Sequence, residues 1–341
     1  MSTKLNTLVT TDDGSNNLVD SQQRLIHILT LIKRTLPYLP LWEDAEKVMS
    51  IANHQGGFGA AGLISWRKFN ALTVSTTPLT EGTTPDGLNI DVATVTDSLD
   101  QYGDWIKISD IAATAGIDDV MKEAMDLLAE NAGQKLHKVI MNALTGGDVT
   151  EIVYGGAASA ANQLTAADVL TSTVIKKAVR FLRNGNVQPY PDGYYRGVIH
   201  PYQAYDLMND PLWQDISKYN GGSANGGGLN LISGEIGRIH GVRFRESTTV
   251  LSDTSGASSA ATYSAFVYGP HSFGVFDLKS QAVNNIDSET NRGITIHSIP
   301  VNTPTKDDPL GLFGLVGWKA SFAAKVYDAT RIVRLRTGAT A

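Results

Sequence analysis

The sequence predicts an α+β fold with a long projecting arm, and three features of the chain carry that prediction. Residues 63–112 form a weakly charged, threonine-rich extended stretch, and residues 118–144 follow it with the period of one long helix. Near the C-terminus, residues 316–326 alternate between larger apolar and small or polar side chains, which is the pattern of a half-buried strand. Together they indicate a mixed chain with an arm that needs another surface to lie on.

Two elements are expected before the arm. Apolar residues recur at helical spacing from Leu25 to Leu36, and Pro37 and Pro40 then end this amphipathic helix. Residues 57–62 match the dinucleotide-binding pattern G-x-G-x-x-G, but a helical stretch precedes them where that motif needs a strand. A flexible hinge is therefore favoured there over a phosphate-binding loop.

The arm itself is expected to be a hairpin. Residues 85–87 read Pro-Asp-Gly and favour a turn, because Pro presets φ and Gly accepts positive φ. Residues 89–96 and 105–109 would then return alongside residues 69–77. Limbs of about 15 residues span on the order of 50 Å, and an isolated two-stranded ribbon is marginal in water. We therefore expect the arm to lie on another copy of the chain.

The helix predicted over residues 118–144 has apolar side chains at every fourth position from Val120 to Leu144. Asp118 and Asp119 suit its N-terminal end, where the helix dipole favours anions, and the glycines that follow Leu144 end it. At 1.5 Å per residue the helix is roughly 40 Å long. Such a helix fits either the core of an ordinary α+β enzyme or a protein that packs against copies of itself.

The remaining chain alternates helices and short strands. A second helix is predicted over residues 165–184, with a capping-box-like start at Thr165 to Asp168, and a third near residues 202–208. Residues 331–336 are expected to pair with 316–326 as a hairpin. Short strands are expected at residues 197–200, 242–245, 265–268, 273–276 and 294–297, with a glycine-rich loop at 221–228.

Composition excludes several classes of function. Of the 341 residues 42% are hydrophobic and 18% are charged, below the ~25% charge that is typical of soluble domains. The net charge of −6 argues against a chain that binds nucleic acid through its overall charge. The absence of cysteine excludes disulfides, thiol nucleophiles and cysteine-ligated zinc. No secretory signal or membrane-length apolar run is found, so synthesis in a reducing cytoplasm is expected.

The search for catalytic motifs finds no convergent set. The 7 histidines show neither H-x-H nor H-x-x-x-H spacing. The glycine-rich loop at 221–228 lacks the ending of a phosphate loop and misses the nucleophile-elbow pattern at its last position. We therefore expect no catalytic residues, no cofactor and no metal site.

Charge patterning singles out two sets of residues. Lys176, Arg180 and Arg183 share one face of the second helix, which is either a solvated face or an interface toward phosphates or acids. The arm has no Lys or Arg from Phe69 to Leu99; its charges there are Glu81, Asp86, Asp91 and Asp97. We expect these acids to meet basic partners on an adjacent copy, with Arg331, Arg334, Arg336 and the helix segment 176–183 as candidates.

Three segments and the order of the elements resemble a known family. Residues 197–208, 234–244 and 308–319 resemble segments of the major capsid proteins of tailed bacteriophages, in the branch typified by N-four-like podophages. The third segment, which reads DPLGLFGLVGWK, is the most similar. The resemblance covers most of residues 20–338 and implies the Hong Kong-phage capsid fold. That likeness assigns residues 1–62 to an N-terminal arm, 63–112 to an E-loop hairpin, 113–185 and 295–341 to a peripheral (P) domain with spine helix 118–144, and 186–294 to an axial (A) domain.

The function that the resemblance implies is structural and not enzymatic. Copies would form hexameric and pentameric capsomers of an icosahedral shell around packaged double-stranded DNA, assembled in the host cytoplasm and kept in the virion. Its partners would be other copies of the chain, a portal, scaffolding or decoration proteins, and DNA through non-specific contacts, with no membrane. Lys176, Arg180 and Arg183 would face the interior or an acid of a neighbouring subunit. Two alternatives stay open: another phage assembly protein such as a tail tube subunit, and an α+β nucleotide-binding or hydrolytic enzyme.

Overall fold

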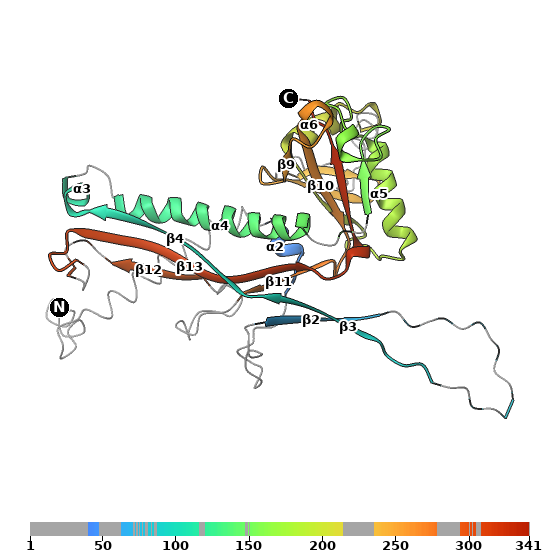
Figure 1. Cartoon of the computed structure of the whole chain (residues 1–341), viewed down its shortest axis with the longest axis horizontal. Coiled ribbons are helices and arrows are strands. Elements are labelled where there is room, and N and C mark those ends of the chain that lie inside the picture. Colours follow the sequence, from blue (N-terminus) through green and yellow to red (C-terminus); the bar gives the residue numbers. More distant parts are fainter. Residues whose placement is uncertain are drawn as a thin grey trace, which may run out of the picture.

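Residues 40–47, 63–70, 87–115, 120–146, 151–213, 235–277, 294–299 and 308–340 of a computed structural model are described below, with a few isolated positions between them. They form an elongated half, a compact half and a two-stranded ribbon that projects from the body (Figure 1). The expected helix at 25–36, the glycine pattern at 57–62, the turn residues Pro85 and Asp86, and the loop at 221–228 lie outside these residues.

The elongated half is a long helix packed along a five-stranded sheet (Figure 1). Strand β13 is its central element: β4 pairs with one edge, while β12 and β11 follow one another along the other edge. The elements of this half are α2 (Pro40–Asp44), β1 (Glu46–Lys47), β4 (Asp100–Ser109), α3 (Asp110–Ala115), α4 (Val120–Gly146), β11 (Phe273–Asp277), β12 (Ile294–Ile299) and β13 (Phe313–Val326).

Periodicity explains why α4 and β13 pack together. Every second side chain of β13 from Val316 to Val326 is buried, whereas Lys319 between them is exposed. The buried face of α4, which includes Leu128, Leu136 and Ile140, belongs to the same core cluster. Two amphipathic surfaces of different period thus cover each other, which is the usual way that a helix and a sheet form one core.

The compact half is a seven-stranded sheet with order β5-β14-β10-β6-β8-β7, and β9 pairs with β10. Helix α5 packs on this sheet through buried residues such as Val174, Ala178 and Leu182. The elements are β5 (Glu151–Tyr154), α5 (Ser172–Asn184), β6 (Tyr195–Ile199), α6 (Pro201–Asn209), β7 (Glu235–Ile239), β8 (Val242–Glu246), β9 (Ser252–Asp253), β10 (Thr262–Tyr268) and β14 (Ile332–Thr337), with short 3₁₀ turns at Ala161–Gln163, Ala257–Ser259 and Ala329–Arg331.

The ribbon consists of β2 (Leu63–Phe69) and β3 (Val92–Ser98), which pair antiparallel from Leu63↔Ser98 to Phe69↔Val92. Its base lies on the elongated half: Ile64 and Trp66 are buried in a cluster with Phe276 and Ala323. The chain then extends away from the body beyond the paired strands (Figure 1). The ribbon is therefore anchored at one end and unsupported by its own chain at the other.

The long helix, the helix near residues 202–208, the long C-terminal strand and the five short strands lie where the sequence predicts them. Helix α6 starts as it does because His200 and Gln203 form a reciprocal capping box, with Pro201 as the first helical residue. The long helix runs from Val120 to Gly146, a shift of two residues from the expected 118–144.

Three expectations about pairing and boundaries are wrong. Residues 105–109 do not return along the arm, because β4 pairs with β13 in the body. Residues 331–336 do not form a hairpin with 316–326, since β14 pairs with β10 and β5 in the other sheet. The second helix begins at Ser172 instead of Thr165, because the Asp168 carboxylate accepts hydrogen bonds from the amide and hydroxyl of Thr165 in a turn that precedes it.

Candidate functional site

A cluster of charged and phenolic side chains joins the two halves of the body. Asp44, at the end of α2, accepts a hydrogen bond from the Tyr268 hydroxyl at 2.9 Å. Its carboxylate lies 3.5 Å from the Arg245 guanidinium and 3.8 Å from that of Arg196. The Tyr190 hydroxyl donates to the main-chain carbonyl of Asp44 at 3.1 Å. A short N-terminal segment that packs on α4 therefore also bonds to the compact half.

The electrostatics of this junction favour a structural role. Burial raises the pKa of Asp44, and the nearby Arg245 charge opposes that shift. Burial likewise raises the pKa of Tyr190 and of Tyr268 above the ordinary phenol value. The Asp44 carboxylate thus has one phenol donor and two arginine charges beside it, and a second phenol bonds its main chain, so Asp44 links the two halves.

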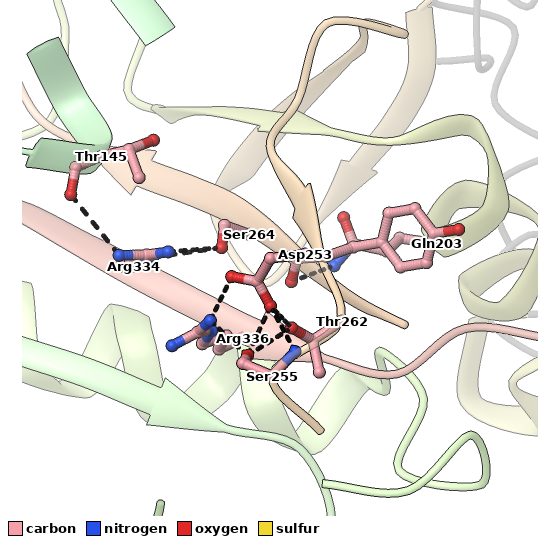
Figure 2. A network of polar contacts seen from close by, with 9 residues as sticks. Thr145, Gln203, Asp253, Ser255, Thr262, Ser264, Arg334 and Arg336 are labelled. Atoms are coloured by element: carbon pink, nitrogen blue, oxygen red, sulfur yellow. Dashed lines mark hydrogen bonds and ion pairs between the residues drawn. The ribbon is translucent and has the colours of Figure 1, made fainter. Parts of the chain in front are cut away.

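A second polar network ties the last strand to the loop between β9 and β10 (Figure 2). Asp253 accepts hydrogen bonds from Ser255 and Thr262 and pairs with Arg336, whose guanidinium also donates to the Ser255 hydroxyl at 2.6 Å. Burial alone would raise the pKa of Asp253, but these hydrogen bonds and the Arg336 charge lower it below the ordinary value. The acid and the hydroxyl groups of this network bond to one another and to Arg336, so we assign the network a structural role as well.

All three C-terminal arginines proposed as partners for the arm have partners within their own chain. Arg331 donates to Asp328 at 2.8 Å. Arg334 donates to the Ser264 hydroxyl at 2.8 Å and to the Thr145 carbonyl at 3.5 Å (Figure 2). Arg336 is held by the network around Asp253. Their docking to an adjacent copy stays a prediction, and it would require them to serve a second partner.

The acids of the arm differ in how far they are satisfied within the chain. At the outer end of the paired strands, Asp91 accepts a hydrogen bond from the Asn70 side-chain amide at 2.6 Å. At the base, Asp97 lies 3.9 Å from the Lys325 ammonium. Glu81, near the tip, is exposed. Asp86 lies outside the described residues.

Lys176, Arg180 and Arg183 lie together on the exposed face of α5. They line an open cleft of about 620 Å³ with Val179, Asn184 and His240. Sequence reasoning found the three cations from their helical spacing but missed His240, which reaches the cleft from the turn between β7 and β8. It also missed Asp44, because no local pattern marks an acid that bonds to strands about 150 residues or more away.

One pair superficially resembles a catalytic arrangement. The Ser172 hydroxyl lies 2.8 Å from His240 Nε2, and Asp210 accepts a hydrogen bond from the Ser172 amide at 2.7 Å. Ser172 is fully buried, and Asp210 holds the serine main chain and not the imidazole. These three groups therefore lack the order of nucleophile, base and orienting acid that acyl transfer needs.

In the described part of the chain no three His, Cys, Asp or Glu side chains gather closely enough to hold a metal ion. Among the same residues no helix has the length and apolar character that would let it cross a membrane. The described residues thus form two polar networks that join parts of the fold, an exposed ribbon and a basic cleft.

This fold and these surfaces define a structural protein. A family model for phage capsid proteins matches residues 92–335, most of the chain, and the chain belongs to this phage capsid protein family. It is therefore a capsid protein of the virion and not an enzyme, and membership of this family favours that reading over a tail tube subunit. No curated protein sequence matches the chain.

Solved phage capsids share the fold at low sequence identity. The capsid of Ralstonia phage GP4 aligns with a TM-score of 0.66 and 16% identity, over 88% of this chain and 91% of the other. The capsid of cyanophage Pam1 gives 0.63 and 16%, over 86% and 88%. The capsid of Helicobacter pylori bacteriophage KHP30 gives 0.61 and 15%, over 88% and 91%. The fold is therefore that of the Hong Kong-phage type, as the resemblance in sequence implies.

Proposed function

We propose that copies of this chain form hexameric and pentameric capsomers of an icosahedral shell that encloses packaged double-stranded DNA. The observation that carries the proposal is the apolar surface of the ribbon and the chain beyond it. Val74 is 85% exposed and Ile90 is 72% exposed, although both side chains are fully apolar. Phe69, Leu72, Leu88 and Val92 are exposed as well. Several exposed apolar side chains along one arm are typical of an interface in soluble proteins.

The arm is proposed to lie over the neighbouring subunit as an E-loop. On this proposal the elongated half is the peripheral domain with α4 as its spine, and the compact half is the axial domain, which meets its copies at the capsomer axis. Sheet pairing supports a boundary different from the one expected, because α5 and β14 pack with the compact half. The proposed partners are further copies of the chain, a portal, scaffolding or decoration proteins, and packaged DNA, with assembly in the host cytoplasm.

Self-association is the first test. The purified full-length chain should form rings or shells at micromolar concentration, seen by light scattering and negative-stain electron microscopy. A sharp monomer peak across dilution, salt and crowding agents would refute the proposal, and tubes would point to a tail protein instead.

The role of the ribbon surface can be tested separately. Replacing Val74 and Ile90 by Ser should abolish or strongly slow shell formation, because each change removes apolar area that the neighbour would bury. Melting of the unassembled chain should be unchanged, since both side chains are already exposed. The matched control, Thr76→Ser with Asn89→Ser, alters exposed polar positions of the same arm and should assemble like the wild type.

A further inference from the structure

A row of cations without acidic partners lies along α5. Lys176, Lys177, Arg180 and Arg183 are exposed, while the opposite face of the helix is buried against the seven-stranded sheet. No ion pair joins any of the four to an acid within the described part of the chain. This is unusual for the compact half, where cations such as Arg196 and Arg336 pair with carboxylates.

Three of these cations converge on the cleft of about 620 Å³ between α5 and the β7–β8 turn, and no acid is among the described residues that line it. His240 lines the cleft from the β7–β8 turn with φ of 51°, a left-handed conformation, and its Nε2 lies 2.8 Å from the hydroxyl of Ser172 in α5. Burial and the nearby Lys176 charge lower the pKa of His240, which favours the neutral imidazole. Its Nε2 already contacts the Ser172 hydroxyl, so a ligand would have to use the other ring nitrogen. A cleft on the other side of α5 contains Glu151, so it is not uniformly basic.

We propose that the cleft between α5 and the β7–β8 turn binds clustered phosphate groups. Positions 176, 180 and 183 span about 10 Å of helix at 1.5 Å per residue. That length covers about three steps of the roughly 3.4 Å axial spacing between phosphates of one nucleic-acid strand, so each cation can meet a different phosphate. Two guanidinium groups supply planar forks of donors that fit phosphate oxygens in pairs, and a lysine adds a point charge.

Phosphate fits better than a single carboxylate from another copy of the chain. Three cations around one cleft leave a net positive site if one carboxylate enters, whereas several linked phosphates neutralise all three. Neutral Asn184 and His240 complete the lining as hydrogen-bonding groups. For packaged DNA the inference rests on the proposed function and names the site of contact; for a free polyphosphate it goes beyond that function, because a shell can close without any phosphate ligand.

The source of the phosphate can be a free polyphosphate anion or the backbone of a nucleic acid, and one experiment separates them. The unassembled full-length chain is titrated at low salt with sodium tripolyphosphate and, separately, with a mixed-sequence DNA duplex. Isothermal titration calorimetry measures the dissociation constants. We expect saturable binding that Lys176→Gln, Arg180→Gln and Arg183→Gln together weaken at least tenfold.

The matched control changes the same charge elsewhere. Lys122→Gln, Lys138→Gln and Lys319→Gln remove three exposed cations from the elongated half, and the control should bind within twofold of the wild type. Circular dichroism and melting confirm that each variant folds. If the triple cleft variant does not fold, Arg180→Gln alone should lose binding partly, and Arg180→Lys less so because it keeps the charge without the fork.

The outcomes are distinct. Binding of tripolyphosphate without binding of the duplex assigns the cleft to free polyphosphate, and binding of both in competition supports a site for linked phosphates from either source. Duplex binding without tripolyphosphate binding, with a slope of log affinity against log salt of roughly −3 for three phosphate contacts, assigns it to nucleic acid. Failure of both ligands to bind, or equal losses in cleft and control variants, overturns the inference. Shells of the cleft variant seen by electron microscopy would then leave the proposed function intact.

Discussion

At the scale of single residues, His137 is a buried titratable group whose protonation should affect stability. It lies in the middle of α4 and is 1% exposed, with Nε2 2.9 Å from the Ser247 hydroxyl oxygen. Its Nδ1 has no hydrogen-bond partner among the described residues. Burial lowers the pKa of His137 from 6.5 to about 4. Protonation would place a second N–H where no acceptor receives it.

The chain should therefore lose stability as the pH falls from about 6.5 to about 4. The folded state resists protonation that the unfolded state accepts, so the free energy of unfolding is highest above pH 6.5 and declines below it. The shift of the His137 pKa from 6.5 to about 4 corresponds to a loss of unfolding free energy on the order of 3 kcal/mol once the pH lies below both values. Urea unfolding of the unassembled chain at a series of pH values measures it.

A variant isolates the contribution of this residue. His137→Gln keeps a side chain that can bond Ser247 but does not titrate, so its free energy of unfolding should fall less steeply between pH 6.5 and pH 4. His297→Gln, at an exposed position, should keep the wild-type slope. Parallel pH profiles for the wild type and His137→Gln would contradict the prediction.

Side chains that lie together could be predicted from the sequence where all of them belong to one helix. Lys176, Arg180 and Arg183 could be placed on one face because helical spacing alone brings them together. Asp44 could not be identified, because its partners come from β6, β8 and β10 and meet it only after both halves have formed. The same holds for His240, whose place in the cleft depends on how two strands turn.

At the scale of elements, the base of the ribbon is fixed by a close contact between Trp66 of β2 and Gly274 of β11. A Cβ added to Gly274 would lie 2.5 Å from the Trp66 indole nitrogen, closer than such atoms approach. Lys68 adds an ion pair to Asp328 at 2.8 Å. The ring rests directly on the backbone of the sheet, so the direction of the ribbon depends on the absence of a side chain there.

Gly274→Ala should displace Trp66 and cost about 1–3 kcal/mol, the usual range for overpacking. The indole must shift, so the tryptophan fluorescence of the unassembled chain should change and shell formation should slow. Gly87→Ala is the control, because a Cβ there meets nothing within 4 Å, and it should melt and assemble like the wild type. Normal assembly by Gly274→Ala would show that the ribbon does not need this contact.

The segment formed by α2 is expected to matter far beyond its five residues. Trp42 is 4% exposed and stacks on Phe322 of β13 with 5.4 Å between ring centroids. Trp42→Ala should lower the free energy of unfolding by about 3–5 kcal/mol, the range for deleting a buried aromatic ring. Glu43→Ala, which removes the carboxylate 3.3 Å from Arg245, should cost at most about 1 kcal/mol. Equal effects of the two changes on urea unfolding would contradict a packing role.

Helices and strands could be predicted from the sequence where a local pattern defines them. The pairing of strands that are far apart in the sequence could not. The alternation in β13 and the four-residue repeat in α4 state which face is buried, and both faces pack as expected. The strand that pairs with β14 cannot be predicted from this alternation, because strands that are near in sequence and strands that are distant show the same pattern. β14 turns away at the Ala329–Arg331 turn, where Asp328 binds Thr330 and Arg331, and enters the other sheet.

At the scale of the whole molecule, charge is distributed unevenly between the arm and the body. The chain from Phe69 to Leu99 carries acids and no bases. Two of those acids already have partners within the chain, Asp91 at the outer end of the paired strands and Asp97 at the base. Glu81 is left exposed near the tip, with Asp86 close to it in the sequence. On the proposed shell, the tip should therefore be drawn to exposed cations of a neighbouring copy.

Glu81→Lys with Asp86→Lys should slow or misdirect shell formation while leaving circular dichroism and melting of the unassembled chain unchanged. Exposed ion pairs contribute only about 0–1 kcal/mol each, so the effect belongs to the rate and register of assembly and should shrink as salt rises. Light scattering at low and high salt measures it. Wild-type rates at both salt concentrations would show that shape and backbone pairing hold the arm without electrostatic help.

The light-scattering assay also shows whether the acidic tip of the arm binds in the same α5 cleft as phosphate. If the cleft takes phosphate and the tip docks elsewhere, saturating tripolyphosphate should leave the wild-type assembly rate unchanged against a sodium chloride control of equal ionic strength. If the acidic tip enters the cleft instead, tripolyphosphate should slow assembly as much as the charge reversal does, and the double variant should become insensitive to it. We expect the first result, because three unpaired cations suit several linked phosphates better than they suit one or two carboxylates on a ribbon.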